Sequence, residues 1–301
     1  IAVGVAILIV ISILYFQIPE SEDDVLLNDE IKTEVIETEK TQIDFLGDSP
    51  IFRLFIYEDH IGILPNGESY ILEIQAEFKS GLEEVYDEIS VLNERQNSVV
   101  IFPIFTSSAY SLYPIDISNR DYGFYDYYEG LCDGPITWAG DCLTTQIKPD
   151  IPKTHNASGM GHEILDLLGY DIITDIDVDK NPEILKRYDK VILLHNEYVT
   201  KTEFNAITNH PKVLYLYPNA LYAEVSVDYE ENTISLVRGH NYPDPEIRNG
   251  FGWEFDNTPM EYDELCENWE FYNIDNGMML NCYPEEIIYK DVKFLKTIKD
   301  Y

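Results

Sequence analysis

Positive charge is scarce in this sequence of 301 residues, which has 20 Lys and Arg against 56 Asp and Glu. The formal net charge is therefore −36. Proteins that bind nucleic acids need a basic surface to meet the phosphate backbone, so this charge balance excludes a nucleic-acid partner. Disorder along the whole chain is excluded as well, because 13% of the residues are aromatic and 45% are hydrophobic, enough to build a core.

Several catalytic motifs are absent from the sequence. It has no Gly-x-Ser-x-Gly or Gly-x-Cys-x-Gly elbow, which excludes a covalent Ser or Cys nucleophile at the usual strand-to-helix turn. His162-Glu163 lacks the second His that a zinc-protease helix carries four residues after the first. The stretch that starts at Asp175 begins like a calcium loop, but Lys180 stands where such a loop needs glycine.

The N-terminal region has two contrasting segments. Ile1–Phe16 contains no charged residue, which predicts a transmembrane anchor or a signal over residues 1–18. We favour the anchor because Leu14–Gln17 offers none of the small residues of a signal cleavage site. Residues 19–48 carry eleven acidic side chains, which predicts an extended tether. We therefore expect a protein of the cell membrane with a single-pass anchor and its domain on the extracellular side.

The four cysteines form two pairs that are local in sequence, Cys132 with Cys142 and Cys266 with Cys282. None of them has the C-x-x-C spacing of a metal or redox site. In an exported chain an even number of cysteines predicts disulfides, here two that close loops, although other pairings stay open. Asn156-Ala157-Ser158 is a glycosylation sequon and suits an exported loop.

The hydrophobic pattern predicts one α/β domain over residues 49–301, with a core at 160–238 and a C-terminal appendage at 239–301. Strands and helices alternate in this core, and the strands are mostly apolar, which predicts a mostly parallel sheet with helices on both faces. A β-hairpin is expected at 222–237, and a strand or amphipathic helix at 287–298. The expected strands lie at 51–57, 69–78, 98–105, 170–176, 190–194 and 212–217, and the expected helices at 81–95, 161–168, 182–187 and 200–208.

Polar residues follow two of these expected strands directly. His195-Asn196-Glu197 comes after the strand at 190–194, and Pro218-Asn219 comes after the strand at 212–217. Ligands of open α/β sheets bind beyond the carboxyl ends of the strands. If the two strands are neighbours, we expect His195, Glu197 and Asn219 to converge at one edge of the sheet.

At these positions the sequence resembles the large (beta) subunit of N,N-dimethylformamidase and its relatives. The resemblance extends over about residues 167–238, and its motifs are Thr174–Asp177, Tyr188-Asp189, His195–Thr200 and Tyr215–Tyr222. It implies a flavodoxin-like fold related to class I glutamine amidotransferases. Active members of the family hold an iron ion with two Tyr and one Glu, next to His and Asn side chains at the substrate.

Transferred by motif, the resemblance implies that Glu197 is a metal ligand and that His195 and Asn219 are catalytic side chains that polarise an amide carbonyl. It implies Tyr110 as a further metal ligand, because Thr106–Ser111 resembles the family's Ala-Tyr-Asn segment. The cofactor it implies is iron. The match is incomplete, because neither a second Tyr ligand nor a separate catalytic Glu has a counterpart in the sequence. Glu254 and Glu270, each beside a Trp, are candidates for a proton-transferring carboxylate on composition alone.

Two functions follow from these residues. The first is an exported, membrane-tethered, metal-dependent hydrolase that acts on a small amide or a related C–N bond. The alternative is a non-catalytic cell-surface protein that keeps the amidotransferase-like scaffold for binding. In that case Glu197 belongs to the start of the following helix and Asn219 is a turn residue that tolerates a positive φ.

Overall fold

The computed structural model of the protein describes residues 41–44, 49–63, 69–71, 73–93, 97–110, 123–128, 142–148 and 158–301. The chain divides into two compact units, residues 1–39 and 40–301, and the described residues all belong to the second. The expected anchor at 1–18 and most of the expected tether at 19–48 therefore lie outside them. Strand β1 (Gln42–Asp44) falls within the tether range, so the described fold begins before Ser49. In these ranges we find no helix whose length and apolar character would let it cross a membrane.

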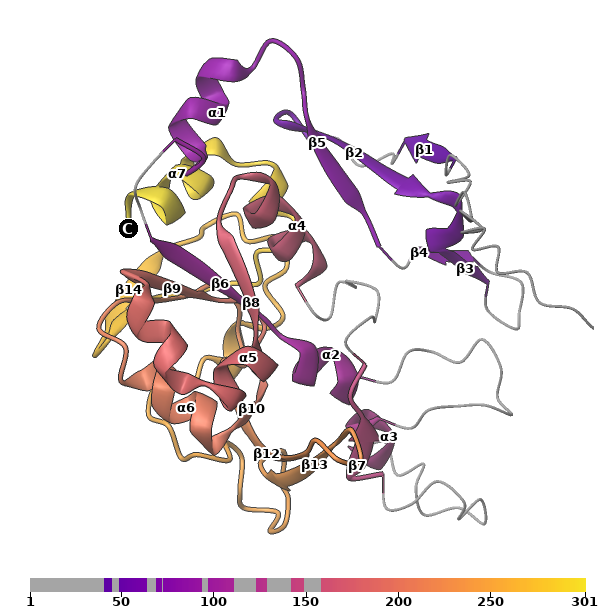
Figure 1. Ribbon diagram of the computed structural model, residues 1–301, viewed down its shortest axis with the longest axis vertical. Helices are drawn as coiled ribbons and strands as arrows, with labels where there is room; N and C mark the ends of the chain where they lie inside the picture. The colour runs from indigo at the N-terminus through magenta and orange to yellow at the C-terminus, as the bar shows by residue number, and fades with distance from the viewer. Residues whose placement is uncertain are drawn as a thin grey trace, which may run out of the picture. The chain divides into compact units, whose positions relative to one another are not determined.

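The chain has a mixed α/β fold built on a sheet with the order β14-β15-β11-β9-β6-β8 (Figure 1). Five of these strands run parallel, and β14 pairs antiparallel at one edge. Their bounds are β6 (Ser98–Phe102), β8 (Asp171–Thr174), β9 (Lys190–Leu193), β11 (Val213–Tyr215), β14 (Phe271–Ile274) and β15 (Gly277–Leu280). The strands expected at 190–194 and 212–217 are confirmed as neighbours, because β9 pairs with β11.

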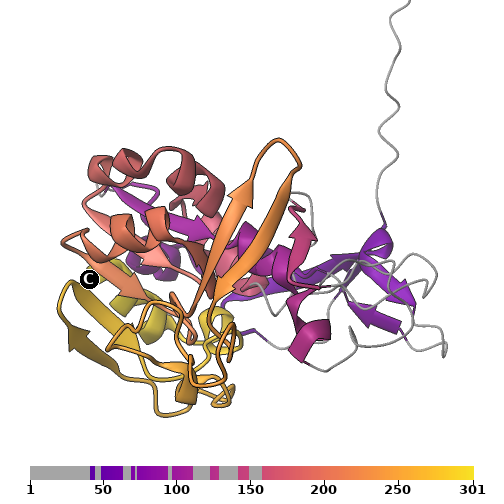
Figure 2. The same ribbon diagram turned by 90° about the horizontal axis from the view of Figure 1, so that it is seen from below.

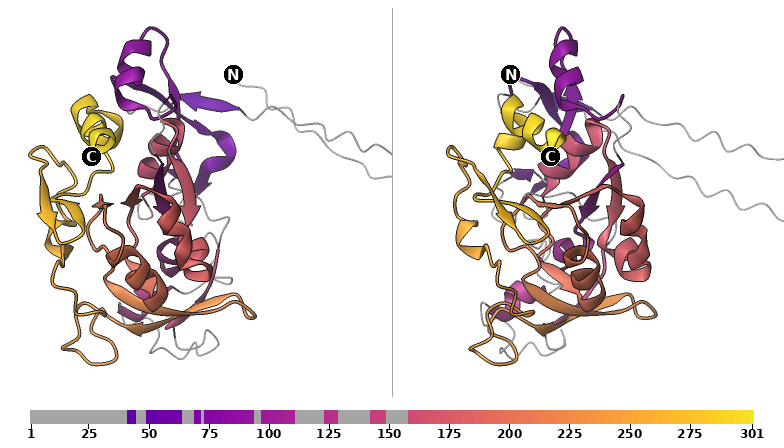
Figure 3. Two further views of the ribbon diagram at one scale, coloured as in Figure 1. Left: turned by 60° about the vertical axis from the view of Figure 1, so that its left-hand side comes forward. Right: turned by 90° about the vertical axis from the view of Figure 1, so that its left-hand side faces the viewer.

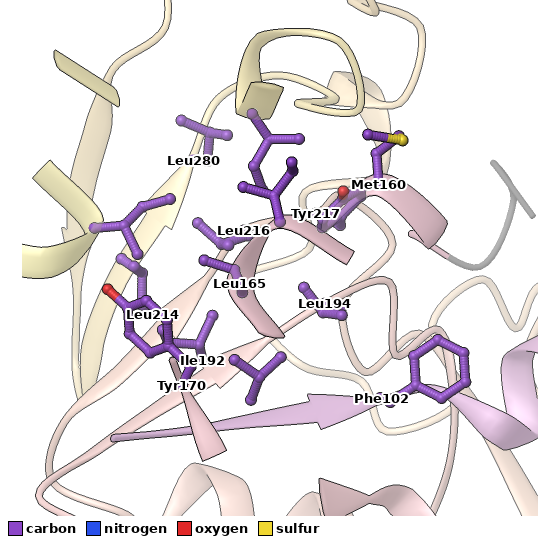
Figure 4. Close-up of a cluster of buried hydrophobic side chains, with 14 of the residues drawn as sticks. Phe102, Met160, Leu165, Tyr170, Ile192, Leu194, Leu214, Leu216, Tyr217 and Leu280 are labelled. Carbon is purple, nitrogen blue, oxygen red and sulfur yellow. The ribbon is translucent and has the colours of Figure 1, made fainter. Parts of the chain in front are cut away.

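Helices cover both faces of this sheet (Figure 1). Successive residues of a strand point to opposite faces, so Ile192 and Leu214 join one buried cluster, while Val191 and Val213 join the other. The first cluster includes α4 (Gly159–Leu167) and α7 (Val292–Asp300), and Figure 4 shows its central side chains. The second includes α5 (Asp175–Lys180) and α6 (Lys201–Thr208).

Three smaller sheets accompany the central one, in the orders β1-β2-β5, β3-β4 and β10-β12-β13-β7. The hairpin expected at 222–237 is confirmed as β12 and β13, which pair antiparallel and stand out as a long hairpin in Figure 2. The strand bounds are β2 (Phe52–Tyr57), β3 (Ile61–Ile63), β4 (Ser69–Ile71), β5 (Gln75–Phe78), β7 (Thr144–Gln146), β10 (Tyr198–Thr200), β12 (Ala223–Asp228) and β13 (Thr233–Arg238).

Several expected elements differ from the structure in length or type. The strand expected at 98–105 ends at Phe102, because Pro103 has no backbone N–H to continue a ladder and instead precedes helix α2 (Ile104–Ala109). The strand expected at 170–176 gives way to α5 at Asp175, where Thr174 forms a capping box with Asp177. The other helices are α1 (Glu83–Ile89), α3 (Phe124–Tyr128), η1 (Glu58–His60), η5 (Pro182–Arg187), η6 (Thr258–Met260) and η7 (Ile287–Tyr289).

The C-terminal region is held by a disulfide and by a buried lysine, Lys299. Cys266 and Cys282 are bonded, as expected, with Cα atoms 5.3 Å apart. Cys142 is also disulfide-bonded, while Cys132 lies outside the described residues. Lys299 Nζ donates to Asp87 O at 2.9 Å, which ties α7 to α1, and the two helices lie side by side in Figure 3.

Candidate active site

The segment after β9 leaves the central sheet and becomes β10 of the second sheet. Backbone hydrogen bonds join this segment to the one after β11: Leu221 N donates to Asn196 O at 2.9 Å, and Tyr222 N donates to Glu197 O at 3.0 Å. Helix α2 holds the segment from the other side, where Thr106 Oγ1 accepts from Glu197 N at 3.0 Å and from Tyr198 N at 3.2 Å. Glu197 is therefore fixed where the chains leaving β6, β9 and β11 meet.

The side chain of Glu197 is the centre of a buried polar cluster. It has no exposed surface. Its Oε2 accepts from the Tyr110 hydroxyl at 2.8 Å and lies 3.8 Å from His195 Nε2. Its Oε1 lies 2.6 Å from His240 Nε2. The structure thus brings together three of the four expected residues, Tyr110, His195 and Glu197, and adds His240 to them.

Burial on its own would raise the pKa of Glu197, because a charge is costly in an apolar interior. The hydrogen bond and charge of His240, the charge of His195 and the hydroxyl of Tyr110 outweigh burial, so the pKa of Glu197 lies below its ordinary value. Glu197 is consequently ionised at neutral pH and acts as a hydrogen-bond acceptor.

His240 reaches Glu197 through an unusual backbone conformation. Gly239, His240 and Asn241 directly follow β13 and have φ values of +127°, +50° and +65°. Residues other than glycine seldom adopt a positive φ, and such strain concentrates at functional sites. The His240 ring stacks on Tyr198 with centroids 5.4 Å apart and meets the edge of Tyr222 at 4.7 Å. These rings fix the orientation of the imidazole towards Glu197.

A second carboxylate stands at the same site. Glu261 is partly buried just after η6, and burial followed by the charge of Glu197 raises its pKa above the ordinary value. The polar side chain of Asn219 and the charges of His195 and His240 act in the opposite direction. Asn219, the fourth expected residue, is near enough to Glu261 to lower its pKa, whereas the contacts of Glu197 described above are with Tyr110, His195 and His240. Glu254 and Glu270, the carboxylates suggested by composition, are both exposed.

Aromatic rings surround the cluster. Tyr110 and Tyr217 lie within 6.3 Å of the His195 ring centroid, and the ring of Tyr283 meets the His195 ring edge-on at 5.7 Å. Tyr128 lies 4.9 Å from the His240 ring and, through its hydroxyl, 3.3 Å from that of Tyr198. Burial raises the pKa of Tyr128. These rings limit water around Glu197 and strengthen its electrostatic interactions.

The donor atoms at this site fit an iron ion. Carboxylate and phenol oxygens are hard donors, and imidazole also suits iron, so Glu197 and Tyr110 could hold the metal beside His195 and His240. In the described ranges, no group of three or more His, Cys, Asp or Glu side chains has a metal-binding arrangement.

Sequence reasoning missed His240 and Glu261, which lie 43 and 64 residues after Glu197. The one local signal was Gly239-His240-Asn241, a glycine and two polar residues directly after a strand, the same position that His195 occupies after β9.

Compared with known proteins, the chain matches no protein-family model and no curated protein.

Proposed function

We propose that this protein is an exported, membrane-tethered hydrolase that cleaves a small amide or a related C–N bond with the help of an iron ion. The observation that carries the proposal is the buried carboxylate of Glu197, which contacts Tyr110, His195 and His240 at the carboxyl edge of a parallel sheet. A fully buried carboxylate whose charge is stabilised by a phenol and imidazoles has a perturbed pKa, and such groups concentrate at functional sites.

The order of the strands supports both the position of the site and the proposed flavodoxin-like fold. Numbered along the chain, the parallel strands β6, β8, β9, β11 and β15 are 1 to 5, and their order in space is 2-1-3-4-5. Flavodoxin-like sheets share this order, and their ligands bind where it reverses, between strands 1 and 3. Tyr110 comes after β6 and α2, and Glu197 comes after β9, so the cluster stands at that reversal.

Each residue has a chemical role in this proposal. Glu197 and Tyr110 would hold the iron ion, which supplies Lewis-acid activation of the amide carbonyl. His195 lies next to Glu197 and would orient or hydrogen-bond the carbonyl oxygen. The carboxylate of Glu261, with its raised pKa, would take a proton from the attacking water and return it to the departing nitrogen as the C–N bond breaks.

A specific observation favours the alternative, a non-catalytic binding protein with the same scaffold. Both oxygens of Glu197 already have partners within the protein, Tyr110 on one side and His240 on the other. A carboxylate whose two oxygens are both hydrogen-bonded within the protein can have a purely structural role, here to hold the loop after β13 in place. The two functions therefore differ in whether a metal replaces one of these contacts.

Elemental analysis of the purified full chain tests the proposal. We expect about one iron per chain, loss of that iron in Glu197→Gln and Tyr110→Phe, and its retention in the matched control Glu254→Gln, an exposed carboxylate. Amine release from small amides should follow the iron content. Protein that stays free of metal after exposure to ferrous and ferric iron, with no amide hydrolysis, would support the binding protein instead.

Membrane tethering depends on residues 1–48 alone. We expect the full chain to fractionate with membranes, and its domain to be accessible to protease added outside intact cells. Recovery of the full chain in the soluble fraction would contradict the tether without affecting the proposed chemistry.

A further inference from the structure

The loop directly after β13 presents His240 to Glu197, and its own backbone holds it in place. Gly239 and Tyr242 pair through two backbone hydrogen bonds of 2.9 Å each. His240 N donates to Arg248 O, also at 2.9 Å. These contacts hold the loop without the His240 side chain, so an anchoring role does not account for the contact between His240 and Glu197.

The same loop packs directly against the hairpin of β12 and β13. A Cβ added at Gly239 would lie 3.0 Å from both Cα and Cβ of Ala223, and one added at Gly250 would clash with Arg238 O. Glycine at these two positions permits the close approach. The packing of the loop therefore sets its backbone, and this backbone places His240 at a φ of +50° with its imidazole towards Glu197.

The distances around Glu197 are those of atoms that can share a metal ion. Two adjacent ligand atoms, each about 2.0–2.1 Å from an ion and at right angles to one another, lie about 2.9 Å apart. The Tyr110 hydroxyl lies 2.8 Å from Glu197 Oε2, and His240 Nε2 lies 2.6 Å from Glu197 Oε1. His195 Nε2 is farther away, at 3.8 Å from Glu197 Oε2. Of the two imidazoles, His240 therefore stands at the distance of an adjacent ligand.

We propose that His240 Nε2 is the third protein ligand of the iron ion, together with the Glu197 carboxylate and the Tyr110 phenol oxygen. The inference rests on the proposed function, since it concerns the metal of the same site. Three protein ligands leave coordination positions open, as in other non-haem iron sites. The set contains only two His, Cys, Asp or Glu side chains, which agrees with the lack of any metal-binding group of three such side chains among the described residues.

The exposure of the ligands fits an ion that can enter and exchange. The side chain of Glu197 is fully buried, whereas that of His240 is 20% exposed. The rings of Tyr198 and Tyr222 pack on the imidazole and fix its plane. An ion held by His240 and Glu197 therefore lies on the side of the cluster that solvent reaches. Coordination replaces the hydrogen bonds to Glu197, because metal ligands bind without their protons.

Electron–nuclear double resonance on the ferric full chain tests the proposal directly, because it detects a nitrogen atom bound to iron. We expect the coupling of a bound imidazole nitrogen in wild type, and a changed coupling when the protein is produced with 15N-labelled histidine. His240→Asn should lose this coupling, since asparagine tolerates a positive φ but has no imidazole. Its iron affinity, measured by competition with a chelator, should fall roughly 100-fold or more, because residues that only orient a metal ligand already contribute about 10–100-fold.

Two comparisons separate ligation from indirect effects. Asn241→Gly is the matched control, because it removes an exposed side chain from the next position of the same loop and keeps a positive φ without strain. We expect it to retain both the coupling and the affinity. His195→Gln removes the other imidazole and should also retain the coupling. Thermal midpoints are compared throughout, and the labelling of wild type stands as a test even where a variant fails to fold.

The outcomes distinguish this inference from the proposed function. Bound iron without a histidine coupling, or a coupling that persists in His240→Asn, would overturn the inference, and amide hydrolysis by the same protein would leave the function standing. A coupling that depends on His240, in protein that releases no ammonia or amine from formamide, N-methylformamide or N,N-dimethylformamide, would support the ligand and remove the function. Protein that takes up no iron would overturn both.

Discussion

Glu285 provides a direct test of how the buried polar groups affect stability. Its carboxyl is 4% exposed, accepts from Met160 N at 2.8 Å and accepts from the Tyr217 hydroxyl. Burial raises its pKa from 4.5 to about 7, against the opposing effect of these hydrogen bonds. The folded protein therefore binds a proton at this site that the unfolded chain has already released at mildly acidic pH.

The sign of the effect follows from this raised pKa. The contribution of Glu285 to stability is fully present below the unfolded pKa of 4.5 and is lost as the pH rises to the folded pKa of about 7. A change in pKa of this size corresponds to about 3 kcal/mol, of which about 2–3 kcal/mol should be lost between pH 5 and pH 8. The substitution Glu285→Gln keeps the shape of the side chain and cannot ionise.

Urea denaturation of wild type and Glu285→Gln at pH 5, 6, 7 and 8 measures this contribution. We expect Glu285→Gln to match wild type at pH 5 and to exceed it by about 2–3 kcal/mol at pH 8. Asp175 and Glu203 are also buried with raised pKa values, so wild type alone would mix their contributions with that of Glu285. If the free energies of unfolding of the two proteins change in parallel across the four pH values, the raised pKa does not belong to Glu285.

Two further predictions concern the scaffold that positions the site. Gly277→Ala should destabilise the fold by about 1–3 kcal/mol or more, because the added Cβ would come within 1.8 Å of Val213 O in the β11–β15 pairing. The control is Gly252→Ala, whose added Cβ meets open space although the φ of residue 252 is strained. Equal losses in thermal midpoint for the two variants would contradict the steric argument. Thr200→Ala should lower the free energy of unfolding by about 1–2 kcal/mol, because it removes the side-chain oxygen that accepts from Glu203 N at the start of α6. Thr200→Ser keeps this oxygen and is the control. An unchanged denaturation midpoint in Thr200→Ala would show that the capping box adds nothing to stability.

The parts of the fold that sequence could predict are those set by local chemistry. The apolar runs before His195 and Asn219 gave two buried strands, and Thr200 followed by Glu203 marked the start of α6. The hairpin of β12 and β13 was equally visible, because polar turn residues separate two alternating stretches. In each case the signal lies within a few residues of the element that it predicts.

Other elements could not be predicted, because distant partners define them. β10 is three residues long, and its pairing with β12 is what makes it a strand. β15 lies in the expected C-terminal appendage, between Cys266 and Cys282, where no strand is expected, yet it pairs in parallel with β11 in the central sheet. Short segments of this kind carry too little periodicity for their structure to be read from sequence alone.

The same distinction applies to the candidate site. Convergence of His195 and Glu197 with the chain after β11 follows from a rule about neighbouring parallel strands. The sequence predicts it on the condition that the two strands are neighbours, and the pairing of β9 with β11 meets that condition. His240 and Glu261 reach the site by long paths through β13 and the C-terminal region, and no spacing in the sequence relates them to Glu197. Their contribution depends on tertiary structure, including the positive φ of His240.

The surroundings of the two carboxylates shift their pKa values in opposite directions, and this difference fits the roles proposed for them. Imidazoles and a phenol lower the pKa of Glu197 despite its complete burial, while burial and the negative charge of Glu197 itself raise the pKa of Glu261. A carboxylate with a lowered pKa keeps its charge and suits a metal ligand or a fixed acceptor. One with a raised pKa exchanges protons closer to neutral pH, as a general acid or base must. Ionisation of Glu197 thus favours the protonated form of Glu261, so replacing Glu197 by Gln should weaken proton transfer as well as metal binding.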